Sequence, residues 1–382
     1  MSYSIAVGGI VGAALCWVFL RVGARVSRHI GLVDHPGGHK CHARPTPLVG
    51  GIAMSIAFVF AVLLLDVPLT PYRFLFAGIM LLVLVGVLDD LRELSPEQRL
   101  WAQILAALLM VGGGGIVLDD LGHLLASEWL LSLGVLAWPI TVFATVGVIN
   151  AMNMSDGLDG LAASFALITL GSLSLFAWRG EDYGILSLLL MLVLVVLPFL
   201  TVNLRSNGSA QVFMGDAGSM FLGFSLAWLL IQASQGEGRL MAPVTALWIF
   251  ALPLLDTITL LIRRSIMGRS PFLGDREHLH HLLLLAGFTE RQTLLLMVAL
   301  ATAAAAFGVA GERLNVPEPW MFGGFVALFG LYFWTTLHML RRRRLPRTES
   351  SSDLSDRLVA HPRTGAEVVS TQRAPRSGSI SG

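Results

Sequence analysis

Long apolar runs recur along this chain, and they restrict its fold more than any other feature. The runs repeatedly reach about 20 residues, the length that an α-helix needs to cross a bilayer. Hydrophobic residues make up 55% of the sequence and charged residues only 13%, and the charges lie in short islands between the runs. A soluble domain would carry about 25% charge throughout its sequence. The sequence therefore predicts an all-α, polytopic membrane protein.

The apolar runs predict about eleven transmembrane helices. They cover roughly residues 4–20, 50–66, 72–88, 100–118, 130–149, 158–178, 183–203, 216–234, 243–262, 292–311 and 319–339. An odd number of spans places the two termini on opposite sides of the membrane.

Basic residues orient these helices. Arg21, Arg25 and Arg28 directly follow the first run, and no A-x-A-like cleavage site does, so we expect a retained helix with its N-terminus outside. The four arginines at 341–344 place the C-terminus in the cytoplasm. Of the 26 Lys and Arg residues, this topology leaves only four outside: Arg73, Arg179, Arg239 and Arg313. We predict a transmembrane domain over residues 1–340 and a basic, disordered cytoplasmic tail over residues 341–382.

The sequence VLDDL occurs twice, with its paired carboxylates at Asp89–Asp90 and at Asp119–Asp120. The predicted span between them places the first pair in the cytoplasm and the second outside, in a solvated turn. Two adjacent carboxylates at a helix C-terminus are disfavoured by the helix dipole and by each other, which favours a compensating cation. For Asp89 and Asp90, the simpler alternative is a solvated helix end.

The segment NAMNMSDGLDG places polar side chains three residues apart at Asn150, Asn153, Asp156 and Asp159. A helix would align them on one face. Amide and carboxylate oxygens suit Mg²⁺, and they also suit sugar hydroxyls or the edge of a nucleobase. Helix capping could use one Asn and one Asp, but four such groups at membrane depth are costly for a purely structural purpose.

Two further cytoplasmic segments carry polar groups. In VFMGDAGS, Asp216 follows a glycine at the start of a span, where it is either an ordinary helix cap or a metal ligand beside phosphate-binding N–H groups. Phe213 could stack on a base or anchor the helix at the membrane edge. In EHLHH, His278, His280 and His281 suit a phosphate, in the neutral or the protonated form, better than they suit zinc.

The first cytoplasmic loop contains Lys40 and His42 beside a turn marked by Pro45, Pro47 and a pair of glycines. Its basic residues serve either to orient the first helix or to face a phosphate. Together, these cytoplasmic segments supply carboxylates and amides for a divalent cation and basic groups for phosphate, in an apolar setting. This combination favours phosphoryl transfer to or from a lipid phosphate.

The order DHPGGHK, PTPLVGG, VLDD, NAMNMSDGLDGLA, VFMGDAGS and DREHLHHLLLLAGFTERQ resembles that of the polyprenyl-phosphate N-acetylhexosamine-1-phosphate transferases, in the MraY–WecA superfamily (glycosyltransferase 4), and especially its WecA-like branch. The resemblance covers residues 30–295. It implies transfer of a sugar-1-phosphate, GlcNAc-1-phosphate above all, from a UDP-N-acetylhexosamine to undecaprenyl phosphate, with release of UMP. The product would initiate a lipid-linked cell-surface glycan.

The resemblance also implies roles for individual residues. It makes Asp89 and Asp90 the catalytic pair, with His280 and His281 beside the reacting phosphate, and it assigns Asn153 and Asp216 to Mg²⁺ or Mn²⁺. The substrate-binding residues would be Lys40, His42, Asn150, Asp156, Asp159, Phe213 and His278. The implied location is the bacterial inner membrane with the site facing the cytoplasm, with no nucleic acid partner and with room for a homo-oligomer.

Two alternatives remain from the sequence. The ARPTPLVGG loop is closer to the corresponding loop of the MraY enzymes, which transfer phospho-N-acetylmuramoyl-pentapeptide, although EHLHH has the WecA-like form. A transporter would use the intramembrane Asp256 and helix-breaking glycines to line a pathway. It would place polar groups near the bilayer midplane, whereas here they gather at one edge.

Overall fold

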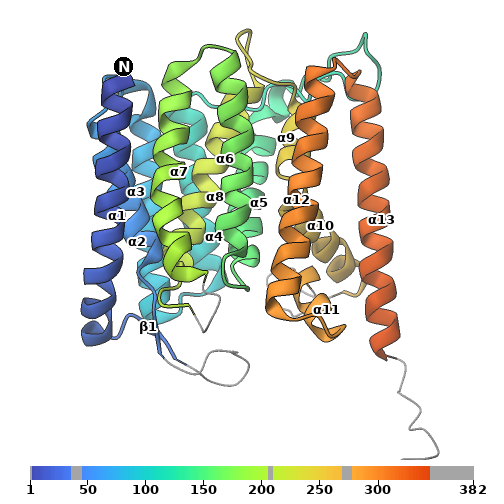
Figure 1. The fold of residues 1–382 in the computed structure, drawn as a ribbon. Coiled ribbons are helices and arrows are strands. Elements are labelled where there is room, and N and C mark those ends of the chain that lie inside the picture. The colour runs from blue at the N-terminus through green and yellow to red at the C-terminus, as the bar shows by residue number, and fades with distance from the viewer. Residues whose placement is uncertain (1, 36–44, 205–209, 269–277, 345–382) are drawn as a thin grey trace, which may run out of the picture. The chain divides into compact units, whose positions relative to one another are not determined.

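The structure is a computed structural model that describes residues 2–35, 45–204, 210–268 and 278–344. The chain divides into two compact units, Met1–Leu340 and Arg341–Gly382. Most described residues are helical, and the long helices of the first unit lie side by side (Figure 1).

The helices in chain order are α1 (Ser2–Ile30), α2 (Gly50–Leu63), α3 (Arg73–Arg92), α4 (Pro96–Leu108), α5 (Ala137–Ser155), α6 (Leu161–Arg179), α7 (Tyr183–Asn203), α8 (Gly215–Ser234), α9 (Pro243–Ile249), α10 (Ala251–Ile266), α11 (Leu279–Leu285), α12 (Glu290–Arg313) and α13 (Glu318–Arg344). Short helical turns are η1 (Thr70–Tyr72), η2 (Leu109–Gly113) and η3 (Gly134–Leu136). The strands β1 (Val33–Asp34) and β2 (Thr46–Pro47) pair antiparallel.

Among the described residues, eight helices are long and apolar enough to cross a membrane, or nine if α9 and α10 form one broken span. The bend between α9 and α10 is 87°. Helix α2 is apolar but has only 14 residues. Helix α4 has 13 residues and continues into the π-helical turn η2. These helices support a polytopic membrane protein, and the count of eleven spans stays a prediction.

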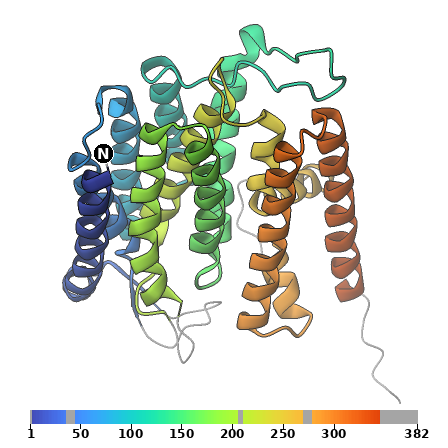
Figure 2. The same cartoon turned by 45° about the horizontal axis from the view of Figure 1, so that its top comes forward.

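One predicted span begins later than its apolar residues suggest. The run at 130–149 becomes helical only from Gly134, first as η3 and then as α5 from Ala137, because Leu131 and Leu133 pair their backbone N–H groups with the carbonyls of Gly122 and Asp119. The connection from α4 to α5 thus folds back on itself and extends across the end of the helices towards α13 (Figure 2). It does so because the N–H of His123 donates to Glu318 at the start of α13.

The second VLDDL lies in this connection and differs from the predicted solvated turn. Asp119 is exposed, but Asp120 accepts the N–H of Gly122 at 2.8 Å and lies 3.8 Å from the guanidinium of Arg239. Asp120 therefore helps to hold the connection in place.

Helix α8 is the most buried of the long helices and packs against α2, α3, α5 and α6. Small residues allow this approach. A Cβ atom added at Gly51 on α2 would lie 2.1 Å from the backbone nitrogen of Gly218 on α8. The N-terminus of α8 is thereby fixed between its neighbours.

Candidate active site

The first aspartate pair joins the end of α3 to the beginning of α8. The Oδ1 atom of Asp90 accepts the N–H of Asp216 at 2.9 Å, and its Oδ2 atom accepts the N–H of Ala217 at 3.4 Å. These N–H groups belong to the first turn of α8, where a helix leaves donors unsatisfied and favours negative charge. Asp90 therefore caps a helix that follows it by more than a hundred residues in sequence.

Asp89 is buried, with 5% of its surface exposed. Its Oδ1 atom accepts the N–H of Leu94 at 2.8 Å, and its Oδ2 atom lies 3.2 Å from the guanidinium of Arg99. The same guanidinium is 4.0 Å from Asp216. Arg99 on α4 thus partly compensates the carboxylates. The sequence shows it as a basic residue that follows the pair in the same segment, but the predicted site residues did not include it.

The predicted amide residues lie on α5 beside this cluster. The amide nitrogen of Asn153 donates to the carboxylate of Asp216 and, at 3.0 Å, to the hydroxyl of Ser219. The amide of Asn150 donates to Gln103 on α4 at 2.7 Å. Asn153 therefore joins the carboxylate cluster directly, whereas Asn150 connects α5 to α4.

The loop after α5 adds two further carboxylates. Burial and the charges of Asp216, Asp159 and Asp90 raise the pKa of Asp156 well above its usual range. Asp159 accepts the N–H of Ala210 at 3.1 Å. The acidic side chains thus extend from α3 and α8 to this loop.

Asn203, at the end of α7, fastens this loop to the segment before α8. Its side chain accepts the N–H of Gly160 at 2.6 Å and donates to the carbonyl of Val212 at 3.0 Å. Asn203 is 3% exposed, and sequence reasoning did not single it out. Its position at the start of the polar NLRSNGS segment was the available signal.

The end of the first loop also meets the beginning of α8. The N–H of Phe213 donates to the carbonyl of Pro47, and the N–H groups of Gly50 and Gly51 donate to the carbonyls of Phe213 and Met214. Phe213 is thus placed at the site end of α8. Lys40 and His42 lie outside the described residues.

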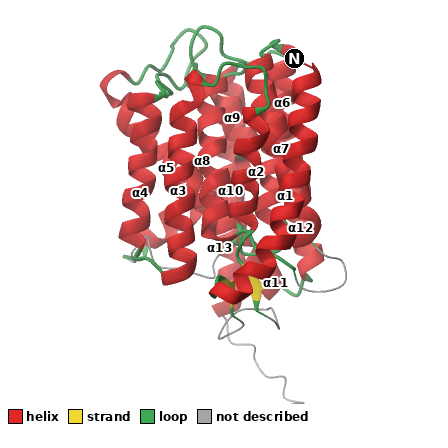
Figure 3. Cartoon of the chain, turned by 90° about the vertical axis from the view of Figure 1, so that its left-hand side faces the viewer, coloured by secondary structure: helices red, strands yellow, loops and turns green. Residues whose placement is uncertain are grey.

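The three histidines lie at the start of α11, at the same end of the helices as the strands (Figure 3). The ring centroids of His280 and His281 are 4.1 Å apart, and those of His278 and His280 are 5.8 Å apart with nearly parallel rings. A Cβ added at Gly157 would lie 2.5 Å from Nε2 of His280. The histidine cluster therefore touches the loop that carries Asp156 and Asp159.

His280 is buried, and its Nε2 atom has no hydrogen-bond partner among the described residues. Burial, followed by the charges of His281 and His278, lowers the pKa of His280 to about 3, against an opposing effect of Asp256. The imidazole is therefore neutral near pH 7. Of the two forms that the sequence left open, the structure favours the neutral one for this residue.

A hard divalent cation suits the groups of the carboxylate cluster. Asp89, Asp90, Asp216 and Asn153 present carboxylate and amide oxygens, and the Oδ2 atom of Asp89 accepts no hydrogen bond from the described residues. Within those same residues, no three His, Cys, Asp or Glu side chains form a ready metal-binding group. A metal here would need the amide of Asn153, a rotated side chain, or oxygens of a substrate.

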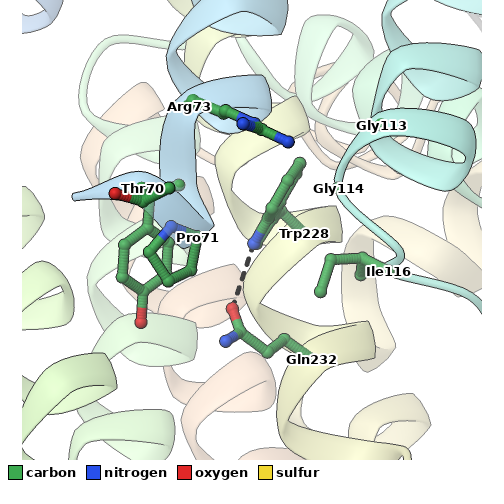
Figure 4. A pocket seen from close by; sticks show the side chains of 9 residues that line it. Thr70, Pro71, Arg73, Gly113, Gly114, Ile116, Trp228 and Gln232 are labelled. Carbon is green, nitrogen blue, oxygen red and sulfur yellow. Dashed lines mark hydrogen bonds between the residues drawn. The ribbon is translucent and has the colours of Figure 1, made fainter. Parts of the chain in front are cut away.

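A cavity of about 290 Å³ lies at the opposite end of α3 and α8 (Figure 4). Thr70, Arg73, Gly114 and Trp228 are among its lining residues, and the indole N–H of Trp228 donates to Gln232. None of the predicted site residues lines it. The polar site therefore lies away from this cavity.

The fold and the site together define a polytopic membrane protein with a polar, acidic site at one end of its helices. Residues 72–234 match the model of glycosyl transferase family 4. The chain belongs to this family, which confirms the resemblance stated from its motifs.

Curated relatives match over nearly their whole length. An undecaprenyl-phosphate alpha-N-acetylglucosaminyl 1-phosphate transferase of Yersinia pestis is 38% identical over 87% of this chain and 94% of its own length. Proteins of the same name from Haemophilus influenzae and Escherichia coli K12 are 38% and 35% identical, over 87% and 88% of this chain and 94% of their own lengths.

Proposed function

We propose that this protein transfers GlcNAc-1-phosphate from UDP-GlcNAc to undecaprenyl phosphate, giving undecaprenyl-diphosphate-GlcNAc and UMP. The observation that carries the proposal is the carboxylate cluster of Asp89, Asp90 and Asp216, which joins α3 to α8 at one end of a membrane protein. The names of the relatives support the acceptor and the sugar. They favour GlcNAc over the pentapeptide substrate of the MraY enzymes.

We place the site end of the helices in the cytoplasm, with eleven spans, the N-terminus outside and the C-terminus inside. The N-terminus of α1 and helix α11, which carries the histidines, lie at opposite ends of the helices (Figure 1), which supports this orientation. The distribution of arginines supports it too. The site would then meet cytoplasmic UDP-GlcNAc at the inner membrane of a bacterium.

In the proposed reaction, an oxygen of the lipid phosphate attacks the β-phosphorus of the UDP-sugar in line. The bond from that phosphorus to the bridging oxygen breaks, and UMP leaves. Asp90 fixes the N-terminus of α8 through two backbone N–H groups. Asp89, whose Oδ2 atom faces Arg99, orients the lipid phosphate. Strong base catalysis is unnecessary, because the second pKa of a phosphate is about 6.

The remaining residues bind the donor. Asp156, Asp159 and Phe213 lie where the nucleotide would enter between the loop after α5 and the start of α8. Neutral His280, with His281 and His278 beside it, would hydrogen-bond the sugar or the diphosphate. Asn150 on α5 donates to Gln103 on α4 and so supports the α5 side of this binding site.

Mg²⁺ or Mn²⁺ would be held by Asp216 and Asn153, with Asp89 nearby. When bound, the ion would neutralise the diphosphate and the departing UMP. We expect EDTA to abolish UMP release and Mg²⁺ to restore it. Titration of the substrate-free protein with Mn²⁺, followed by electron paramagnetic resonance, should show a bound ion that Asp216→Asn weakens by about tenfold or more. Equal Mn²⁺ binding by both proteins would contradict this assignment.

The assay that tests the function uses purified protein, undecaprenyl phosphate, Mg²⁺ and a panel of UDP-sugars, with UMP release as the readout. UDP-GlcNAc should give the fastest release. A folded protein that releases UMP from none of the UDP-N-acetylhexosamines would refute the proposal. Fastest release from UDP-N-acetylmuramoyl-pentapeptide would replace it with the MraY reaction.

The contact between the loop after α5 and the histidines predicts a sensitive position. Gly157→Ala would push its Cβ against Nε2 of His280, so the ring or the loop must move. We expect UMP release to fall by about tenfold to a hundredfold, because small displacements in an active site are costly. Gly147→Ala is the matched control, since no atom lies within 4 Å of its added Cβ. If both variants behave like the wild type, His280 does not require this contact.

A further inference from the structure

Asp256 is an acid within α10 to which the proposed mechanism gives no role. Its carboxylate accepts three hydrogen bonds: from Nδ1 of His278 at 2.8 Å, from the N–H of Leu279 at 3.1 Å and from the hydroxyl of Tyr332 at 2.7 Å. The first two donors stand at the beginning of α11, which carries the histidine cluster. Asp256 therefore fastens the histidine cluster to the broken helix.

The third donor comes from α13, a helix that carries none of the predicted site residues. Tyr332 is 9% exposed and belongs to the apolar cluster that contains Leu255, Leu279 and Leu283. Its ring is thus held by packing, and its hydroxyl points at a single carboxylate oxygen, Oδ1, which the N–H of Leu279 also approaches. Tyr332 therefore helps to fix the orientation of that carboxylate from α13.

The orientation of the carboxylate matters because it determines which nitrogen of His278 carries a proton. A carboxylate at Nδ1 keeps the proton on that atom and leaves Nε2 as the nitrogen that can face a ligand. The ring of His278 lies nearly parallel to that of His280, which touches Gly157. A rotation of Asp256 would therefore move His278 first and then its neighbours.

We propose that Tyr332 is a positioning residue for the donor substrate: through Asp256, its hydroxyl holds His278 and the histidine cluster in the binding orientation. The inference rests on the proposed function, in which these histidines bind the sugar or the diphosphate. Tyr332 itself does not touch the substrate. Through this contact, α13 contributes indirectly to the orientation of the substrate site.

The test compares Tyr332→Phe with the wild type in the UMP-release assay. We expect the KM for UDP-GlcNAc to rise about tenfold, as a lost hydrogen bond to a carboxylate would allow, with kcat changed by less than about twofold. Tyr72→Phe makes the same chemical change at a buried tyrosine. Tyr72 lies just before α3, at the end of that helix away from the aspartate pair, and it lines the cavity of Figure 4. This variant should leave KM unchanged.

A double-mutant cycle separates positioning from general weakening of the fold. If Tyr332 acts through His278, then Tyr332→Phe adds little to the KM of His278→Gln. If the two substitutions raise KM independently, so that their factors multiply in the double variant, the inference is overturned while the proposed function stands. A wild-type KM in Tyr332→Phe would overturn it in the same way.

A wild type that releases no UMP would instead contradict the proposed function. The contact can then be tested without turnover, by nuclear magnetic resonance of ¹⁵N-labelled histidine. The Nδ1 signal of His278 should shift in Tyr332→Phe and not in Tyr72→Phe, and an unchanged signal would refute the positioning role.

Discussion

Asp89→Asn and Asp90→Asn should each reduce UMP release by at least about a hundredfold, the scale of a lost charged group in a catalytic site. Asn has nearly the shape of Asp but lacks the charge. In Asp89→Asn the guanidinium of Arg99 loses its nearest carboxylate, and in Asp90→Asn the first turn of α8 loses its anionic cap. Initial rates at saturating substrates, with the melting temperature of each variant, would test this.

The matched control is Asp119→Asn, in the second VLDDL. The side chain of Asp119 is exposed on the connection between α4 and α5, so this variant should retain nearly full activity. Asp120 is a poorer control, because it accepts the N–H of Gly122 and pairs with Arg239. Equal losses in the Asp89 and Asp119 variants would contradict the assignment of the site to the first pair.

Gly51→Ala should cause a large loss of stability, because among the described glycines its added Cβ would come closest to the backbone of another helix. The new Cβ would lie 2.1 Å from the nitrogen and 2.3 Å from the Cα of Gly218, and backbone atoms cannot rotate away as a side chain can. Overpacking a core commonly costs about 1–3 kcal/mol. We expect the melting temperature in detergent to fall by several degrees, together with activity, because the start of α8 moves with Gly218.

Gly147→Ala serves again as the control for this variant. It adds the same atom to a helix, in open space, and Ala favours helices over Gly. Its melting temperature should equal or exceed that of the wild type. If Gly51→Ala melts at the same temperature as Gly147→Ala, then α2 and α8 do not meet as closely as described.

The helices could be predicted from the sequence because lipid forces the backbone to satisfy its hydrogen bonds within each segment. The breaks within and before these helices could not be predicted in this way. Residues 243–262 are apolar on both sides of Phe250, so composition does not reveal the bend between α9 and α10. The late start of α5 depends on backbone pairing with Gly122 and Asp119, which no local pattern records.

The candidate site was predictable to the extent that it depends on topology. Assigning loops to one side of the membrane was enough to group the carboxylates of α3 and α8 with the amides of α5. The supporting contacts were not predictable, because each partner lies far away in sequence. Asn203 holds Gly160, and Tyr332 reaches Asp256 from α13. The polar segment that begins at Asn203 marked that residue but not its partner, and Tyr332, a single polar residue in an apolar run, gave no hint of Asp256.

The burial of α8 has a consequence for how the protein is made. Its mean hydropathy is well below that of α7, because α8 contains many glycine, alanine and serine residues. These small residues are buried against other helices. Such a segment partitions poorly into lipid by itself. We expect α8 to enter the membrane together with the earlier helices that surround it. The carboxylates of α3 would then reach the membrane edge before α8 is inserted, and the site would form only when α8 packs against α3.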